Sequence, residues 1–279
     1  MTGDDHALAR DLAAEAGRRL IGLRAHGGDP DVLRKAGDRL SHEFLTAALA
    51  ERRPGDVVLS EEGADNPARL GARRVWIVDP LDGTREFGEP GRTDWAVHVA
   101  LWERDPGDLT AGAVALPAQG EVLSTLELPD RCDIEPVIAG TVPHRAGSVG
   151  GEQGAGRGNE AGAAPARMRI VVSRTRAPQF VRNISDLVHA ELVPMGSAGA
   201  KVAAVISGEV DAYVHGGGFY EWDTAAPVAV ARAAGFHASR IDGSPLVYNQ
   251  ADLLMPDILV CRPALAGVLL SAIRELKEF

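Results

Sequence analysis

Carboxylates at three places along the chain could together hold hard metal cations. Glu61 follows a short apolar run, and Asp79 and Asp82 flank a proline that ends another. Asp223 opens an alanine-rich segment of helical composition. Oxygen ligands without sulfur are the ligands that Mg²⁺ prefers. We therefore expect carboxylates, a metal and a bound phosphate to share one pocket.

The segment from Asp79 to Thr84 reads Asp-Pro-Leu-Asp-Gly-Thr. Proline fixes its own backbone, so it predicts a turn at the mouth of the strand, and glycine lets the chain pass close to a ligand. If Thr84 begins a helix, its N–H groups form an anion site, and the Leu81 carbonyl becomes a further metal ligand. Two alternatives stay open: such a segment is often an ordinary surface turn, and Asp223 is often only a helix N-cap.

Length and charge restrict the class of protein. The 279 residues are 45% hydrophobic, enough to bury a full core, with 29 basic against 39 acidic residues and a net charge of −10. An acidic surface repels phosphate backbones, which argues against a nucleic-acid partner, and a small anion would need a local positive centre such as a metal. The two cysteines lie far apart and predict neither a disulfide framework nor a structural zinc.

Targeting signals are not apparent in the sequence. The N-terminus is acidic where a signal peptide would be basic, and no apolar run is long enough to span a membrane. We therefore expect a soluble, cytoplasmic chain without a membrane partner.

Hydrophobic periodicity predicts an α+β first part, residues 1–143, followed by an α/β part, residues 167–279. The Gly-rich segment 144–166 between them predicts a flexible loop. The helices are expected at 4–26, 35–52, 178–189, 198–207, 223–234 and from 263. The strands are expected at 57–59, 75–78, 95–102, 111–116, 121–126, 134–140, 168–173, 191–194, 210–214 and 258–261.

Two motifs resemble a known family. The segment 79–84, together with Trp222-Asp223-Thr224-Ala225-Ala226, is similar to the two signatures of the inositol monophosphatase-like superfamily of metal-dependent, lithium-sensitive phosphomonoesterases. The resemblance covers nearly the whole chain. It implies a layered αβαβα sandwich of the inositol monophosphatase and fructose-1,6-bisphosphatase type.

Three segments resemble the CysQ-type branch, and the actinobacterial members look nearest. They are Arg85-Glu86-Phe87 after the first signature, Gly-Ser-Ala-Gly-Ala-Lys at 196–201, and Asp-Gly-Ser-Pro-Leu-Val-Tyr at 242–248. This branch implies a 3′(2′),5′-bisphosphate nucleotidase that hydrolyses 3′-phosphoadenosine 5′-phosphate to AMP and phosphate and supports sulfate assimilation.

The resemblance implies a role for individual residues. Two or three Mg²⁺ ions would be held by Glu61, Asp79, Asp82, Asp223 and the Leu81 carbonyl. The attacking water would be activated and oriented by Asp38, Glu61 and Thr84. The substrate would be bound by Gly83, Thr84, Ser173, Arg174, Lys201 and Tyr248. His215 stands where relatives often carry arginine, which weakens the expectation of tight bisphosphate binding. His98 is interpreted as surface or core, and Trp222 as a buttress of the metal site.

Two other functions remain open at this stage. The same chemistry could act on inositol 1-phosphate or fructose 1,6-bisphosphate, and a protein of another class could bind metal or phosphate without catalysis. The family resemblance also implies a homodimer.

Overall fold

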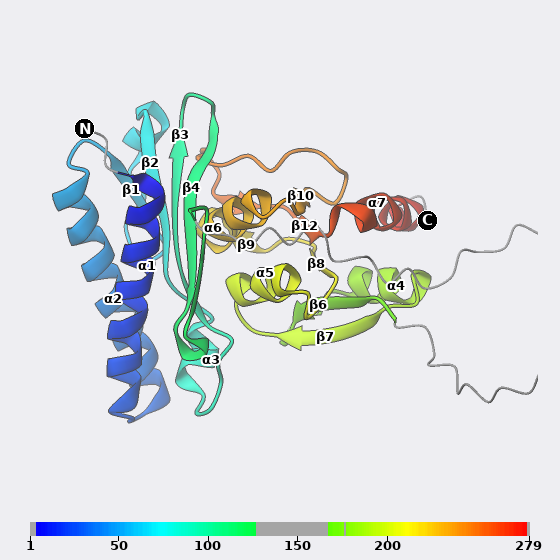
Figure 1. The fold of residues 1–279 in the computed structure, drawn as a ribbon, viewed down its shortest axis with the longest axis horizontal. Coiled ribbons are helices and arrows are strands. Elements are labelled where there is room, and N and C mark those ends of the chain that lie inside the picture. Colours follow the sequence, from blue (N-terminus) through cyan, green and yellow to red (C-terminus); the bar gives the residue numbers. More distant parts are fainter. Residues whose placement is uncertain (1–3, 127–166, 176, 278–279) are drawn as a thin grey trace, which may run out of the picture.

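Helices and sheets alternate in five layers in this computed structural model, which describes residues 4–126, 167–175 and 177–277 (Figure 1). A helix pair, a sheet, a second helix pair, a second sheet and a last helix pair follow one another across the molecule. The predicted layered αβαβα sandwich is confirmed. The predicted strand 134–140 and flexible segment 144–166, with the boundary at 143, lie outside the described residues.

Helices α1 (Asp5–Ala25) and α2 (Pro30–Arg52) form the first layer. Each begins after an aspartate whose side chain accepts two backbone N–H groups, Asp4 for α1 and Asp29 for α2. Helix α2 thus starts earlier than the predicted residue 35, because Asp29 caps it and proline fits the first helical position.

The first sheet runs in the order β1-β2-β3-β4-β5 within the described part of the chain. Strands β1 and β2 are parallel, and the other neighbours are antiparallel. The strands are β1 (Val57–Ser60), β2 (Arg74–Asp82), β3 (Ala96–Glu103), β4 (Asp108–Leu116) and β5 (Glu121–Ser124). The connections contain the short helices η1 (Pro67–Gly71), α3 (Thr84–Gly88) and η2 (Pro117–Gln119).

The second sheet has the order β10-β12-β8-β6-β7 among the described residues, with parallel pairing only around β6. Its strands are β6 (Arg169–Ser173), β7 (Glu191–Met195), β8 (Ala212–His215), β10 (His237–Ser239) and β12 (Ile258–Cys261). Helices α4 (Gln179–Leu187) and α7 (Pro263–Lys277) pack beyond it. The short strands β9 (Phe219–Tyr220) and β11 (Leu254–Met255) pair beside it. Strands β9, β10 and β11 were not predicted, because each has only two or three residues.

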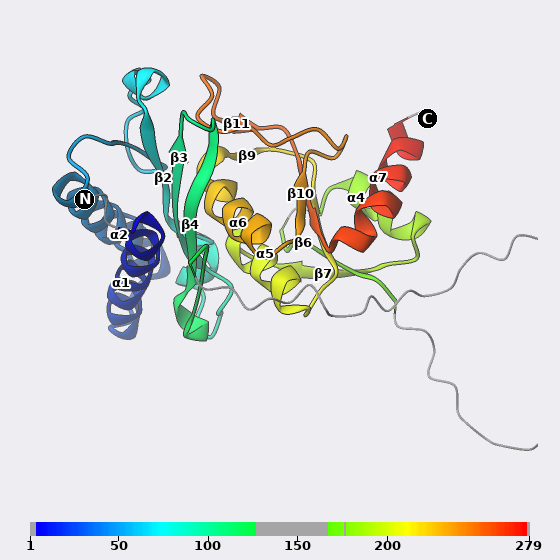
Figure 2. The ribbon, with the colours of Figure 1, turned by 45° about the horizontal axis from the view of Figure 1, so that its top comes forward.

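The middle layer consists of α5 (Ala198–Ser207) and α6 (Glu221–Ala233), which lie between the two sheets (Figure 2). Side chains of β2 alternate: Val75 and Ile77 join the core that contains α5 and α6, whereas Trp76 and Val78 face the first helix pair. One hydrophobic core thus joins residues from both parts of the sequence. No described helix is long and apolar enough to cross a membrane.

Gly112 tests how closely α6 lies on the first sheet. A Cβ added there would lie 2.8 Å from the Ala229 Cβ. We predict that Gly112→Val lowers the free energy of unfolding by about 1–3 kcal/mol, because an overpacked core must shift. Urea denaturation measures the loss. Gly22→Ala is the control, since nothing lies within 4 Å of its added Cβ, and alanine in helix α1 should stabilise by about 0.5–1 kcal/mol. Equal stability of Gly112→Val and wild type would contradict the packing described.

Candidate metal centre

Three carboxylates meet at the junction of the first sheet and the middle layer. Asp79 and Asp82 lie on the last residues of β2, and Asp223 lies in the first turn of α6. One oxygen from each of the three lies within 4.8 Å of the others. The structure therefore brings together residues from the two motifs that the sequence separates by 140 positions.

The first motif continues strand β2 to Asp82, where the sequence predicted a turn. Asp79 opposes His98 and Asp82 opposes Ala96, so three steps along β2 match two steps along β3 and one residue bulges out. Pro80 has no N–H to give to the ladder, which favours the bulge at this point. Residues three apart in a regular strand point to opposite faces, and the extra residue brings both carboxylates to the same face.

Gly83 and Thr84 follow the bulge. Gly83 has φ +84°, a conformation that glycine adopts without strain, and α3 begins at Thr84 as expected. The Leu81 carbonyl accepts a hydrogen bond from Thr84 Oγ1 at 2.9 Å, and the Leu81 N–H donates to Asp79 Oδ1 at 3.0 Å. The predicted ligand carbonyl is therefore held within the same turn as the carboxylates.

Asp223 lies two residues further into the helix than the predicted start at 223. The helix begins at Glu221 with Tyr220 as its N-cap, which makes Asp223 the third helical residue. Its Oδ2 accepts the Tyr220 N–H at 2.6 Å, and the carboxylate also belongs to the cluster. The alternative that Asp223 is the helix N-cap is wrong, because Tyr220 holds that position.

Glu61 follows β1, and its N–H donates to the Val78 carbonyl at 3.4 Å. Its side chain shares a hydrogen bond with Asp79 and is repelled by Asp223, so it adjoins the three clustered aspartates. Partial removal of the Glu61 carboxylate from water, followed by its repulsion from Asp223, raises the pKa of Glu61 to about 8. Glu61 and Glu62 are both exposed, so Glu61 lies at the rim of the cluster, and the charge of Glu62 contributes to the raised pKa of Asp38.

The electrostatics of the cluster fit a cation. Burial, followed by repulsion from Glu61 and Asp82, raises the pKa of Asp79 well above its usual range, and burial beside Asp82 raises the pKa of Asp223 to about 7. Groups that repel one another in this way are stabilised when a positive ion lies between them. An all-oxygen set of carboxylates and a carbonyl suits a hard divalent cation, and the residues present therefore fit the metal that the sequence predicted.

Asp82 is fixed by residues from the second part of the chain. Its Oδ2 accepts Ser197 Oγ at 2.6 Å and the Gly199 N–H at 2.9 Å, both from the start of α5. His98 lies on the other side, with Nε2 3.3 Å from Asp82 Oδ2 and Nδ1 3.2 Å from the Trp222 carbonyl. His98 is fully buried, and burial lowers its pKa.

The sequence analysis missed His98 as a neighbour of the metal ligands. One signal was available: His98 interrupts an apolar strand at the same alternation as Ala96 and Ala100, whose side chains face the middle layer. Trp222 was expected to buttress the site, and its carbonyl contacts His98.

Asp38 reaches the site from α2. Thr84 Oγ1 lies 3.3 Å from Asp38 Oδ1 and 2.9 Å from the Leu81 carbonyl, so its single proton has two acceptors. Burial, followed by the charge of Glu62, raises the pKa of Asp38 to about 6. The structure thus places Asp38 beside Thr84, where the resemblance had put it.

Two adjoining cavities open beside the carboxylates, of about 480 and 240 Å³. Ser173 and Lys201 line both. The larger cavity is also lined by Asp82, Asp223, Tyr213, His215 and Phe219. The smaller is also lined by Gly83, Thr84, Arg85, Glu86 and Arg174. A ligand that spans both would therefore pass from the metal cluster to a group of basic side chains.

Two of the basic residues, Lys201 and Arg174, already have partners. Lys201 is buried and donates from Nζ to the Ser197 carbonyl at 2.8 Å, and desolvation lowers its pKa. Arg174 forms ion pairs with Glu86 at 2.7 Å and Glu89 at 2.8 Å, which raise its pKa. Glu86 belongs to the segment that carried the resemblance to the CysQ-type branch, and its pairing with Arg174 was not predicted.

His215 and Tyr248 occupy different environments. Burial and the neighbouring Lys201 lower the pKa of His215 to about 4, and its Nδ1 accepts the Gly217 N–H, so the ring is neutral in the larger cavity. Tyr248 is only 2% exposed, and its hydroxyl donates to Thr224 Oγ1 at 3.2 Å. The prediction that Tyr248 contacts substrate is wrong, because its ring is part of the core behind α6.

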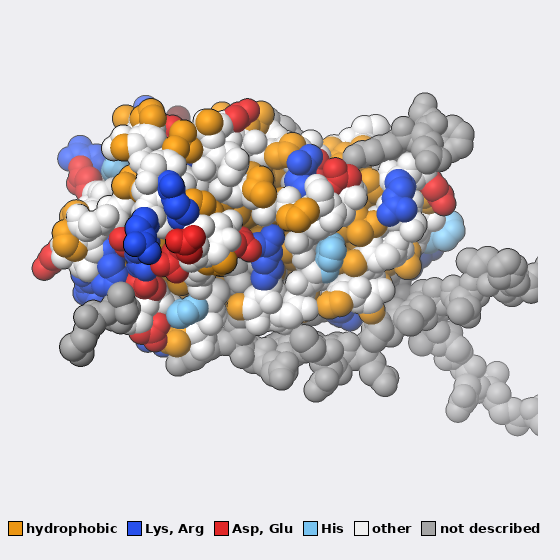
Figure 3. Space-filling model, turned by 90° about the horizontal axis from the view of Figure 1, so that it is seen from above, with side chains coloured by type: hydrophobic (Ala, Val, Ile, Leu, Met, Phe, Trp, Pro, Cys, Tyr) orange, Lys and Arg blue, Asp and Glu red, His pale blue; other side chains and the backbone are white. Residues whose placement is uncertain are grey.

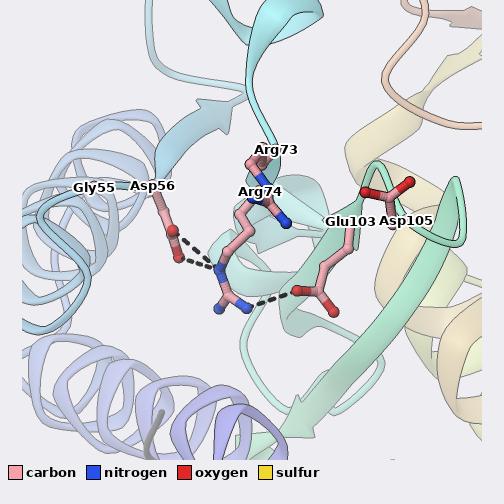
Figure 4. Close-up of a pocket in the computed structure, with 6 residues that line it drawn as sticks. All are labelled: Gly55, Asp56, Arg73, Arg74, Glu103 and Asp105. Carbon is pink, nitrogen blue, oxygen red and sulfur yellow. Dashed lines mark hydrogen bonds and ion pairs between the residues drawn. The ribbon is translucent and has the colours of Figure 1, made fainter. Parts of the chain in front are cut away.

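Another hollow of about 380 Å³ lies at the opposite end of β2 (Figure 4). Arg74 extends across it and pairs with Asp56, Glu103 and Asp5 at 3.0, 2.7 and 2.9 Å. Figure 3 shows charged side chains of both signs gathered over this part of the surface. The guanidinium is satisfied by the protein itself, so we interpret this hollow as an ion-pair network that joins strands and helix α1.

Comparisons with known proteins agree with this geometry. Residues 8–278 match the model of the inositol monophosphatase family. The chain is 48% identical, over 97% of its length and 94% of the relative, to the 3′-phosphoadenosine 5′-phosphate phosphatase of Mycobacterium leprae. CysQ from Bacteroides thetaiotaomicron has a similar fold, with a TM-score of 0.67 and 27% identity over 94% of this chain and 98% of that one. A 2′AMP-bound SaIMPase-II structure has a TM-score of 0.69 at 20% identity, over 98% of both chains.

The carboxylate cluster should make the chelated protein less stable as the pH rises. Asp223 and Glu61 have folded pKa values of about 7 and about 8, against ordinary values of 3.8 and 4.5. At a pH between the ordinary and the folded pKa values, the folded state binds more protons than the unfolded state. The free energy of unfolding therefore falls as the pH increases. We predict a melting temperature in EDTA that is several degrees lower at pH 8 than at pH 5.5. Excess Mg²⁺ should reduce this difference, and a melting temperature in EDTA that rises with pH would contradict the raised pKa values.

Asp82→Asn should separate metal binding from folding. The change removes one repelling charge and keeps the side-chain size, so the chelated variant should melt at or above the wild-type temperature. A cation at about 100 times its dissociation constant stabilises a protein by about 2.7 kcal/mol. We predict a stabilisation of that order for wild type and at least tenfold weaker Mg²⁺ binding for the variant, measured by thermal melts across a Mg²⁺ titration. The exposed Asp186→Asn is the matched control and should respond to Mg²⁺ as wild type does.

Proposed function

The chain belongs to the inositol monophosphatase family, and from this premise we propose that it is a Mg²⁺-dependent phosphomonoesterase that converts 3′-phosphoadenosine 5′-phosphate to AMP and phosphate. The observation that carries the proposal is the 48% identity, over 97% of the chain, to a phosphatase that is named for this nucleotide. A basic cavity that adjoins the carboxylate cluster supports it, because this substrate carries two phosphates. The role in sulfate assimilation and the homodimer, which the family resemblance implied, stay predictions.

The metal would be held by Asp79, Asp82, Asp223, Glu61 and the Leu81 carbonyl. Mg²⁺ fits because every one of these donors is oxygen and a cation would stabilise the ionised form of carboxylates whose pKa values are raised by burial and mutual repulsion. When bound, divalent cations at such a site supply Lewis-acid activation of water and neutralise charge on the phosphate and the leaving oxygen.

Asp38 and Thr84 would orient the attacking water. Thr84 Oγ1 can give its proton to Asp38 Oδ1 or to the Leu81 carbonyl, and its lone pairs then accept from a water on the open side. Asp38, with a pKa of about 6, is ionised at neutral pH and can accept a hydrogen bond from the Thr84 hydroxyl. The Thr84 oxygen can then accept a hydrogen bond from the water. Glu61 would take a proton from the water only when a bound cation keeps its carboxylate ionised, because its pKa without metal is about 8.

The substrate would lie across the two cavities. The phosphate to be cleaved would meet the Gly83 and Thr84 N–H groups near the carboxylates, as the residues lining the smaller cavity allow. Lys201 keeps two N–H donors beyond its bond to Ser197, and with Ser173 it lines both cavities, so it would contact the second phosphate.

One observation favours a smaller substrate as the second candidate. Arg174 is already paired with two glutamates and His215 is neutral, so these two residues offer little free positive charge to a second phosphate. Inositol 1-phosphate carries one phosphate and would need fewer positively charged groups for binding. Fructose 1,6-bisphosphate would test the effect of a second phosphate without a nucleoside.

Release of free phosphate from a panel of substrates tests the proposal. With Mg²⁺ we predict that kcat/KM for 3′-phosphoadenosine 5′-phosphate exceeds that for inositol 1-phosphate and fructose 1,6-bisphosphate by at least tenfold. Asp82→Asn should be inactive on all three and serves as the control for contaminating phosphatases. A sugar or inositol phosphate turned over as well as the nucleotide would overturn the substrate assignment, and turnover of none of them would favour a binding protein.

Lys201→Met tests recognition of the second phosphate. A hydrogen bond to a charged group contributes about 1.5–3 kcal/mol, so its loss should raise KM for 3′-phosphoadenosine 5′-phosphate about tenfold or more. The comparison substrate is 3′-AMP, which has no 5′-phosphate, and its KM should change by less than about threefold. An equal increase for both nucleotides would mean that Lys201 acts on the cleaved phosphate or on the fold.

A further inference from the structure

A buried polar cluster outside the metal ligands joins three segments of the chain. It consists of Arg69 on η1, Asn249 on the loop before β11, and Glu221 at the start of α6, and we call it the Arg69 clamp. The three residues are 1%, 5% and 0% exposed. The sequence analysis gave none of them a role, and none is a metal ligand.

The hydrogen bonds of the clamp are reciprocal. Arg69 Nη1 donates to Asn249 Oδ1 at 2.9 Å, and Asn249 Nδ2 donates back to the Arg69 carbonyl at 3.2 Å. Arg69 Nη2 donates to the Gln250 carbonyl at 2.8 Å. Glu221 accepts the N–H groups of Asn249 and Gln250, one on each carboxylate oxygen, both at 2.7 Å.

The clamp connects the two segments that carry ligands from opposite parts of the chain. Arg69 lies on the loop that leaves β1 through Glu61, and Glu221 lies two residues before Asp223. Glu61 and Asp223 repel each other across the site, so the metal-free protein gains energy if these two segments separate. The loop at Asn249 is bonded to both segments and opposes that separation.

Burying the charged groups of Arg69 and Glu221 costs desolvation free energy. A contribution to fold stability does not by itself account for their burial. Arg69 also forms an ion pair with Asp65 on its own loop, with Nε 2.7 Å from Oδ1. A buried ion pair is often no more stabilising than apolar residues of the same size, because desolvation offsets the attraction. A guanidinium fork with fixed partners does, however, define distances between segments. The clamp therefore matters because it fixes the positions of the segments that carry Glu61 and Asp223.

We propose that the Arg69 clamp sets the separation of Glu61 and Asp223 before the cation arrives, so that Arg69 is a positioning residue for metal binding. The inference rests on the proposed function in one respect, that the carboxylates bind a divalent cation. Groups that orient ligands from outside typically contribute about 10–100-fold to metal affinity.

The test is calorimetric titration of Mg²⁺ into the chelator-treated full chain without substrate. Arg69→Lys keeps the charge and loses the fork, and we expect Mg²⁺ to bind about tenfold more weakly. The kcat at saturating Mg²⁺ should stay within about twofold of wild type, because the ligands themselves are unchanged. A variant with wild-type Mg²⁺ affinity, or with kcat lowered as much as affinity, would overturn the proposal.

Arg104→Lys is the matched control. Arg104 donates to the carbonyls of Ala72 and Leu70, so it holds the same short helix η1 that carries Arg69, and neither bond involves Asn249 or Glu221. Its substitution should leave Mg²⁺ affinity unchanged even if it lowers the melting temperature. Equal weakening of Mg²⁺ binding by Arg104→Lys and Arg69→Lys would mean that loop stability alone is responsible, against the proposal.

Asn249→Gly provides a second variant in case Arg69→Lys does not fold. Asn249 has φ +58°, which glycine adopts freely, and the change removes only the side-chain link to Arg69. We expect about threefold weaker Mg²⁺ binding with the Glu221 bonds to backbone retained. If this variant binds Mg²⁺ as tightly as the wild-type protein does, the role of the clamp is overturned and the proposed function is unaffected. If the wild-type protein itself binds no Mg²⁺, both are overturned.

Discussion

Mutual repulsion among buried carboxylates is the constraint on which the rest of this structure depends. Asp79, Asp82 and Asp223 are held with oxygens within 4.8 Å of one another, and Glu61 adjoins them. Left alone, such a cluster favours protonation or separation, because water is excluded and the charges are alike. The fold has to supply enough rigidity to hold the cluster together until a cation compensates it.

The middle layer supplies much of that rigidity. Helices α5 and α6 belong to the second part of the sequence but pack on the first sheet, and each brings its N-terminal end to the site. Ser197 and Gly199 fix Asp82 from α5, while α6 carries Asp223 itself. The two parts of the chain therefore cannot be treated as separate functional units, because the metal ligands come from both and one core holds them.

The net charge of −10 acquires a different meaning at this site. A surplus of acid opposes anionic ligands in general, but part of it lies in the carboxylate cluster, where a bound cation reverses the local sign. Basic groups nearby are few and partly paired, with Arg174 neutralised by Glu86 and Glu89. Under the proposed function, discrimination among phosphates would depend on Lys201 and on the shape of the two cavities more than on total charge.

The sequence by itself determined the layered fold, the carboxylates that form the cluster and, through the family resemblance, the pairing of Asp38 with Thr84. Hydrophobic periodicity and the two motifs are local or family-level signals, and they can be recognised in the sequence without knowing any distance in the folded protein. Only the tertiary structure decided that a bulge turns Asp79 and Asp82 to one face, that Tyr248 is buried in the core, and that His98 lies against the ligands. Contacts such as Glu86 with Arg174, or Arg69 with Asn249, join residues about 90 and 180 positions apart. No local pattern specifies such pairs, because their approach is set by how helices and sheets pack, and that packing is a property of the whole chain.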